Sequence, residues 1–151
     1  MQCGGFVDIC TFIGHKDCKS EIKDTLYDVI EKLIVDDGVK VFYVGVQGNF
    51  DKYVYQTLLE LEKKYILKIV VVLAYLNNKR DIYYDMEKTE FPLQLENVPL
   101  RFAISKRNEY MLKKSRYLVC YVNDSFSNSY KFVERAKKLN LKIINIGKLL
   151  I

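Results

Sequence analysis

The side chains best suited to chemistry lie in four short segments of this sequence. The first covers residues 11–16 and contains Gly14, His15 and Lys16. Gly14 would allow a ligand to approach the backbone closely, and Lys16 could meet a phosphate. A turn at Gly14 that leads into a capped helix explains the same residues without a ligand. We treat this segment as a candidate ligand contact.

The second segment, residues 45–51, combines two glycines with amide and carboxylate side chains. Gly45, Gln47 and Gly48 come first, and Asn49 and Asp51 follow them. Such a series suits a tight turn that feeds the amino terminus of a helix, which is a natural anion site. Capping of that helix by Asn49 or Asp51 is the simpler explanation. The position after a predicted strand makes the segment a ligand-binding candidate.

Arg107 and Asn108 form the third candidate. On a helix, Asn108 shares one face with Ile104 and Met111, and Arg107 lies beside that face. This face is the one expected to pack inward, and buried Arg and Asn side chains are costly unless they are paired. The two residues therefore hold either a structural network or a polar site, and we favour the site.

The fourth segment, residues 122–130, is a run of small polar residues between a predicted strand and a predicted helix. Its candidate ligand-binding residues are Asn123, Ser125, Ser127, Asn128 and Ser129. Backbone amides at such a helix start, together with serine hydroxyls, could cradle a phosphate. Ordinary capping by Asp124 or Ser125 is the alternative. We predict the phosphate cradle here, and Glu134, two turns further on, matters only if it faces the same crevice.

The hydrophobic pattern predicts the elements that hold these segments. Runs rich in β-branched and aromatic residues, typical of buried strands, cover Ile9–Ile13, Val39–Val44, Lys68–Tyr75, Arg116–Val122 and Leu141–Ile146. Apolar residues at helical spacing lie between them, over Ile22–Leu33, Val54–Tyr65, Phe102–Ser115 and Phe132–Leu139. This alternation predicts an α/β, Rossmann-like three-layer fold, with about five mainly parallel strands and helices on both faces. The ligand crevice of such a sheet lies outside the carboxyl ends of its strands, and this rule nominates the four segments.

One connection is much longer than the others. Residues 76–100 show no clear periodicity and contain both prolines, Pro92 and Pro99, together with Tyr83 and Tyr84. A loop of that length in a compact domain is usually a lid, a binding loop or an oligomer arm. We expect residues 1–151 to form a single domain, with residues 76–100 as its lid or as a dimer arm.

Composition and charge limit the classes of binding partner that we expect. Of the 151 residues, 28% are charged and half are hydrophobic, and the formal net charge is +5. The cations are scattered rather than gathered into a stripe, which argues against a nucleic-acid partner. The apolar runs fall short of the ~20 residues that a membrane span needs, and Asp8 interrupts the first run. We therefore expect a cytoplasmic protein without a membrane segment or signal peptide, whose apolar surplus favours self-association.

The cysteines and the single histidine do not suggest a metal site. Cys3, Cys10, Cys18 and Cys120 include no Cys-x-x-Cys pair, and His15 is the one histidine of the sequence. We expect reduced thiols, no bound metal and no cofactor.

Three motifs together carry a likeness to a known family. They are the strand ending Phe12–Lys16, the helix motif Ser105–Asn108, and Tyr117–Asn123 leading into Tyr130–Ala136. In order and content they resemble the YpsA-like branch of the SLOG superfamily, which also includes the LOG phosphoribohydrolases and the DprA-type DNA-processing domain. The likeness covers nearly the whole chain, and it implies the same Rossmann-like sheet.

The LOG enzymes are similar in two further motifs. Their Arg-Lys-x-x-Met helix motif aligns with Arg107–Met111, and their glycine-rich phosphate loop aligns with Ser127–Glu134. The resemblance implies that Arg107 holds the phosphate or ribose, while Glu134 stabilises an oxocarbenium-like centre or activates water. Two positions depart from the family pattern. Ser127-Asn128 replaces Gly-Gly, and Asn108 replaces lysine.

Three functions are compatible with these observations. The first, which we favour, is a module that binds a nucleotide or a nucleotide-derived molecule such as an ADP-ribose-like compound, with Tyr83, Tyr84 or Phe126 stacking on the base. The second is an N-glycosidase that hydrolyses nucleoside 5′-monophosphates, with Arg107 and Glu134 as its catalytic pair. The third is a DprA-like module that interacts with nucleic acid or protein.

Overall fold

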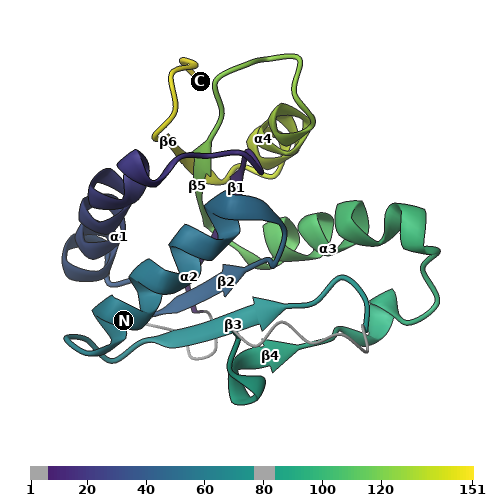
Figure 1. Ribbon diagram of the computed structural model, residues 1–151, viewed down its shortest axis with the longest axis horizontal. Coiled ribbons are helices and arrows are strands. Elements are labelled where there is room, and N and C mark those ends of the chain that lie inside the picture. Colours follow the sequence, from purple (N-terminus) through teal and green to yellow (C-terminus); the bar gives the residue numbers. More distant parts are fainter. Residues whose placement is uncertain (1–6, 77–83) are drawn as a thin grey trace.

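The computed structural model describes residues 7–76 and 84–151 (Figure 1). The strands are β1 (Ile9–Gly14), β2 (Val41–Val44), β3 (Lys68–Val72), β4 (Thr89–Glu90), β5 (Tyr117–Tyr121) and β6 (Lys142–Asn145). The α-helices are α1 (Lys23–Asp37), α2 (Gly48–Glu62), α3 (Leu100–Lys114) and α4 (Asn128–Lys138), and single 3₁₀ turns cover Ser20–Ile22, Met86–Lys88 and Leu93–Leu95. Strands and helices therefore alternate along most of the described chain.

The described strands form one parallel sheet in the order β4-β3-β2-β1-β5-β6. From β1 the chain builds outward through β2, β3 and β4, and it then crosses back to place β5 on the other side of β1. The direction of growth thus reverses between β1 and β5. In open parallel sheets such a switch point opens a crevice beyond the carboxyl ends of the strands. The predicted α/β Rossmann-like fold is confirmed.

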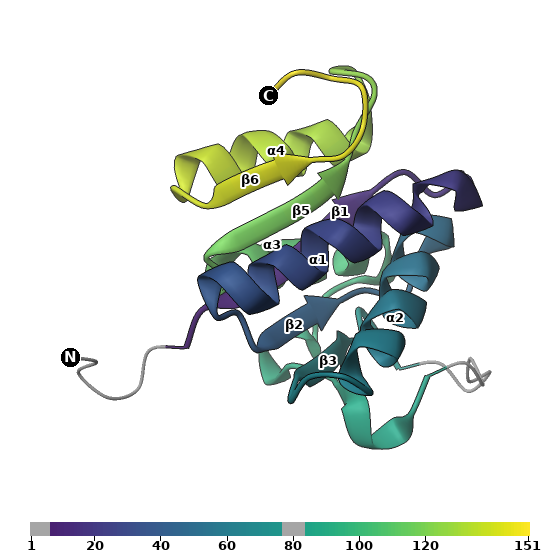
Figure 2. The same cartoon turned by 90° about the vertical axis from the view of Figure 1, so that its left-hand side faces the viewer.

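Alternate side chains of each strand pack on opposite faces of the sheet. In β5, Tyr117 and Val119 join the core formed with α1 and α2, whereas Leu118 and Cys120 join the core beneath α4. Met111 of α3 packs on the same side as α4, against the end of β3. Figure 2 shows α1 and α2 in front of the strands, with α3 and α4 behind them. The sheet is therefore the middle of three layers.

The stretch of residues 76–100 contains a sixth strand that the periodicity did not predict. β4 has two residues and pairs with Val71 and Val72 at the edge of the sheet. Two residues are too few to show an alternating pattern. Just before it, the Tyr84 ring packs against the Tyr55 ring of α2, with 4.7 Å between their centroids. The part of this stretch that the structure describes thus runs along the β3 edge, while Tyr83 lies outside the described residues.

Two helices begin earlier than their apolar patterns indicate. α2 begins at Gly48 rather than at Val54, and α4 begins at Asn128 rather than at Phe132. Their first turns are mostly polar, so hydrophobic spacing does not mark them. These first turns are the parts of the two helices that meet at the carboxyl edge of the sheet. Among the described helices, none is long and apolar enough to cross a membrane.

Candidate functional site

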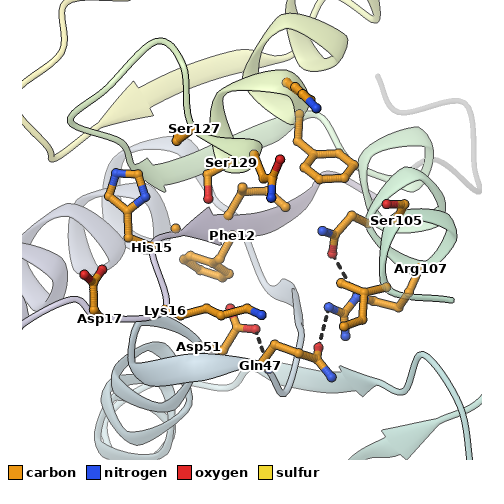
Figure 3. Close-up of a pocket in the computed structure, with 17 residues that line it drawn as sticks. Phe12, His15, Lys16, Asp17, Gln47, Asp51, Ser105, Arg107, Ser127 and Ser129 are labelled. Atoms are coloured by element: carbon orange, nitrogen blue, oxygen red, sulfur yellow. Dashed lines mark hydrogen bonds between the residues drawn. The ribbon is translucent and has the colours of Figure 1, made fainter. Parts of the chain in front are cut away.

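A cavity of about 540 Å³ opens over the carboxyl edge of the sheet, where the strand order reverses (Figure 3). Ligand sites for small molecules are usually between about 300 and 1,000 Å³. The cavity is lined from β1 and its following loop, from the β2–α2 connection, from α3 and from the first turns of α4. Four chain segments that are distant in sequence therefore face one space.

The loop after β1 contributes Gly14, His15 and Lys16 to the lining. His15 Nε2 accepts a hydrogen bond from the backbone N–H of Asn123 (2.9 Å), and its ring meets Tyr121 edge to face. The imidazole thereby fastens the loop that follows β5 to the loop that follows β1. Lys16 is exposed, and its side chain extends along the cavity (Figure 3).

Gly48 allows the β2–α2 connection to come close to the β1 loop. Its φ of +81° lies in the left-handed region that favours glycine, and an added Cβ would stand 2.6 Å from the Cα of Lys16. Asn49 reinforces this approach, because its backbone N–H donates to the Lys16 carbonyl at 2.8 Å. The turn positions Gln47 and Asp51, which both line the cavity.

Arg107 reaches from α3 across the carboxyl ends of the strands and is only 1% exposed. Its Nε donates to Asn108 Oδ1 (2.9 Å), Nη1 to the Val72 carbonyl (3.1 Å), and Nη2 to Gln47 Oε1 (2.6 Å). A buried guanidinium needs such partners to offset its desolvation. The structural network and the polar cavity wall, which sequence reasoning offered as alternatives, are here made of the same residues.

Asp51 is the acidic counterpart of Arg107. Its Oδ2 accepts from the backbone N–H of Gln47 at 2.9 Å. Burial raises the pKa of Asp51 to about 6, although the Arg107 charge and the Gln47 N–H both oppose that rise. Burial also lowers the pKa of Arg107, with Asp51 opposing the change. Gly45 lies between them, since a Cβ there would be 2.8 Å from Asp51 Oδ2 and 2.9 Å from Arg107 Cζ.

The amino terminus of α4 forms the opposite wall of the cavity. Ser127 caps the helix, because its hydroxyl accepts from the backbone N–H of Tyr130 at 3.2 Å. Ser127, Asn128 and Ser129 line the cavity, and Lys131, two residues further along, lines it as well. The amides of a first helical turn have no carbonyl partner within the helix and carry the positive end of its dipole. This wall therefore favours an anionic group.

The structure brings most of the predicted site residues together. Those that line the cavity are Gly14, His15, Lys16, Gln47, Arg107, Asn108, Ser127, Asn128 and Ser129. Gly45, Gly48 and Asn123 contact or bond to lining residues without lining the cavity themselves. Ser125 is exposed on the loop before α4 and is not part of the lining.

Glu134 does not share the cavity with Arg107. Its side chain is half exposed, and its carboxylate pairs with Lys137, 3.4 Å away on the same helix. The cavity is lined by α4 residues only as far as Phe132. The two residues that the LOG resemblance implied as a catalytic pair are therefore not arranged around one substrate position in this structure.

Asp51 is the main lining residue that sequence reasoning did not select as a site residue. Within the sequence it was considered only as a helix cap. A signal was nevertheless present, because Asp51 stands in line with Val54, Leu58 and Leu61, the buried stripe of α2. An acidic residue in an apolar stripe is unusual unless it has a partner or a ligand. Phe12, Ile13, Asp17, Ile104, Ser105, Lys131 and Phe132 complete the lining.

The described residues contain no group of three or more His, Cys, Asp or Glu side chains that could hold a metal ion. The lining residues offer hydrogen bonds and charge to a ligand. The α4 wall presents amide donors and Lys131, and the opposite wall presents Lys16, a buried guanidinium, an amide and a carboxylate (Figure 3).

Comparison with known proteins identifies a structural neighbour. No protein-family model and no curated protein matches the chain. The fold is similar to that of DNA processing protein A (DprA) from Streptococcus pneumoniae, whose X-ray structure superposes with a TM-score of 0.70 at 17% sequence identity. The match covers 92% of this chain and 50% of that chain, so this chain spans about half the length of DprA. At this identity the likeness shows a DprA-like, Rossmann-like fold.

Proposed function

We propose that this protein binds a nucleotide or a nucleotide-derived molecule in the cavity at the switch point of its sheet. The observation that carries the proposal is the meeting of the α4 amino terminus with Lys16, Lys131 and the buried Arg107 around one cavity. The motif likeness to the YpsA-like branch of the SLOG superfamily supports the same function, and membership of that branch is part of the proposal.

The phosphate of the ligand would lie against α4. The amides of Asn128 and Ser129 have no carbonyl partner inside the helix, and the Ser129 hydroxyl adds a donor that can rotate. The Ser127 hydroxyl instead donates to the Asp124 carbonyl at 2.8 Å and holds the turn before the helix. Lys16 and Lys131 supply positive charge from two sides of the cavity. This arrangement compensates a phosphate by dipole, hydrogen bonds and charge together.

The placement of Glu134 argues against the catalytic pair that the LOG resemblance implies. Cleavage of an N-glycosidic bond requires a carboxylate near the sugar carbon where positive charge develops. Glu134 pairs with Lys137 outside the cavity lining, so Arg107 has no such partner on α4. A sensor or sequestering module needs only the cavity and its polar walls.

The test is to incubate the protein with nucleoside 5′-monophosphates and ADP-ribose, and to analyse both the solution and the molecules released on denaturation by mass spectrometry. We expect intact ligand in the protein fraction and no free base in solution. Free base and ribose phosphate that accumulate with time would instead establish a hydrolase. Absence of any retained compound would contradict the proposal.

The phosphate position is tested by paired lysine variants and calorimetry. Lys16→Ala and Lys131→Ala should each weaken nucleotide binding by about tenfold, the worth of one charge-assisted hydrogen bond. Lys19→Ala and Lys138→Ala are the matched controls, since both lysines are exposed near the same segments but do not line the cavity. Equal losses in all four variants would indicate a general charge effect and contradict the assigned position.

A second candidate function comes from the DprA-like fold. The neighbour is a DNA processing protein, and a phosphodiester could occupy the same α4 wall as a nucleotide phosphate. Filter binding with single-stranded DNA would show steeply salt-dependent affinity if several backbone phosphates are contacted. Retention that does not weaken in Lys16→Ala or Lys131→Ala would place any such binding away from the cavity.

A further inference from the structure

We infer that Asp51 is the specificity residue of the cavity, and that it accepts hydrogen bonds from the vicinal hydroxyls of a ribose. The inference rests on the proposed nucleotide function and adds the chemical class of the sugar to it. The ligand would then lie with its phosphate on α4 and its ribose at the far wall, and deoxy sugars would be discriminated against.

Asp51 is buried but faces the cavity. Its residue surface is 7% exposed, and it belongs to the cavity lining. Among the described residues, the backbone N–H of Gln47 holds Oδ2 at 2.9 Å, whereas Arg107 acts on the carboxylate through its charge rather than through a direct ion pair. The carboxylate is thus fixed in orientation by one oxygen, and it retains acceptor capacity for a ligand.

The surroundings of Asp51 suit a sugar better than a base. Gln47 Oε1 accepts a hydrogen bond from Arg107 at 2.6 Å. The amide nitrogen of Gln47 therefore remains as a donor beside the Asp51 carboxylate, which is an acceptor. A hydroxyl group both donates and accepts, so a vicinal pair can satisfy such mixed neighbours at once. A base would need flat apolar walls for stacking. Asp51, Gln47 and Arg107 form a polar side of the cavity (Figure 3).

The two walls lie on opposite sides of the cavity. Figure 3 shows Ser127 and Ser129 on one side of Phe12, and Asp51 and Gln47 on the other. A ribose phosphate can span such a cavity with its charged end on the α4 amides. A ligand without the sugar hydroxyls would cover the carboxylate and leave its Oδ1 without a donor, and an unpaired buried polar atom discriminates strongly.

The experiment compares ribonucleoside 5′-monophosphates with their 2′,3′-dideoxy counterparts by titration calorimetry, with ribose 5-phosphate as a probe that lacks a base. For the wild type we expect the dideoxy compounds to bind about ten- to a hundredfold more weakly, the range for hydrogen bonds to a charged group. In Asp51→Asn this ratio should fall to about threefold or less, because an amide group penalises the dideoxy compounds less than a desolvated carboxylate does. Asp36→Asn, an exposed position on α1, is the control that should keep the full ratio.

Each result separates the two claims. Equal binding of ribo and dideoxy compounds by the wild type would overturn the role of Asp51 and leave the nucleotide proposal standing. Binding of neither class, nor of ribose 5-phosphate, would overturn both. A ratio that persists in Asp51→Asn would assign the discrimination to another residue. If that variant does not fold, Asp51→Glu keeps the charge but moves the carboxylate by one methylene, and it should likewise lose the ratio.

Discussion

At the scale of single residues, the cavity is built on two buried opposite charges that do not touch. Arg107 satisfies its guanidinium with Val72, Asn108 and Gln47, while Asp51 is held by the Gln47 backbone. Gln47 is therefore the residue that joins the two through different atoms. Such a linked network fixes the side-chain orientations more firmly than a single ion pair would. The wall is accordingly organised before any ligand arrives.

The raised pKa of Asp51 predicts a specific pH dependence of stability. The pKa is about 6 in the folded protein against an ordinary value of 3.8, so between these values the folded state holds a proton that the unfolded chain has released. The contribution of Asp51 to the free energy of unfolding therefore falls as the pH rises from 4 to 6, by roughly 2–3 kcal/mol. Urea denaturation of the wild type and of Asp51→Asn at a series of pH values measures it.

In this comparison the asparagine variant should gain stability relative to the wild type as the pH rises, with the difference constant above pH 7. Asp36→Asn, whose side chain is exposed, should follow the wild type at every pH. A difference between Asp51→Asn and the wild type that does not change from pH 4 to pH 7 would contradict the raised pKa.

The predicted inward position of Arg107 and Asn108 agrees with their burial, because a helix face has a regular period and polar residues on an inward face stand out. Sequence reasoning did not select Asp51, which is also inward on α2, because capping by Asp51 would place that residue before the first turn, whereas α2 begins at Gly48. It selected Glu134 from family likeness, and a likeness in motif does not fix which way a side chain points. Periodicity thus located Arg107 and Asn108, whereas motif alignment did not fix the orientation of Glu134.

At the scale of elements, the positive φ of Gly48 joins the β1 loop to the start of α2. Gly38, the residue after α1, also has a positive φ (+69°), but an added Cβ there would meet no atom within 4 Å. Gly38→Ala should therefore cost about 1 kcal/mol, from the backbone conformation alone. Gly48→Ala should cost about 2–3 kcal/mol, since its Cβ also meets the Lys16 backbone. Urea denaturation of both variants measures these costs.

The same pair of variants distinguishes a structural turn from a site. Gly48→Ala should also weaken ligand binding, because relief of the contact displaces Lys16, while Gly38→Ala should leave binding unchanged. Equal stability losses in the two variants would show that the close approach of the β1 and β2 loops contributes nothing beyond the backbone angle.

The loop between β5 and α4 is held at its start by His15. The Nε2 lone pair accepts from the Asn123 N–H, and the Asn123 side chain in turn accepts from the backbone N–H of Lys148 at 2.8 Å. Removal of the imidazole in His15→Ala should expose the Asn123 amide, and its hydrogen exchange should accelerate at least tenfold. Exchange at Val119, within β5, provides the internal reference. Unchanged protection of Asn123 would mean that the loop is held from the Lys148 side alone.

Elements were predicted well where they bury a regular apolar face, and less well at their polar ends. The five predicted strands and four predicted helices are all present, since buried strands and amphipathic helices have a regular spacing of apolar residues. β4 was not predicted, because a two-residue strand is defined by its pairing with β3 rather than by its own sequence. The first turns of α2 and α4 lie outside the predicted helices because most of their residues are polar and do not extend the apolar pattern.

At the scale of the whole molecule, the cavity requires both halves of the sheet. The β1 and β2 loops come from one side of the switch point, and α4 follows β5 on the other side. Cys10 lies in the core beneath α1 and α2, whereas Cys120 lies in the core beneath α4. Both are fully buried, and burial raises the pKa of Cys120 to about 12 and that of Cys10 further. Each thiol therefore reports the opening of one face.

If residues 1–151 form the single domain that the sequence predicts, these two thiols become reactive together, since a single domain loses both cores in one transition. The Cys3→Ser variant, which removes the cysteine outside the described residues, is pulsed with N-ethylmaleimide at increasing urea and analysed by mass spectrometry. Each molecule should carry either no label or the full set, including Cys18, which is 2% exposed. Because β1 and β5 are hydrogen-bonded neighbours, separation of the faces would expose the edges of both strands. Molecules labelled at Cys120 but not at Cys10 would contradict the single cooperative domain, and would divide the site between two units.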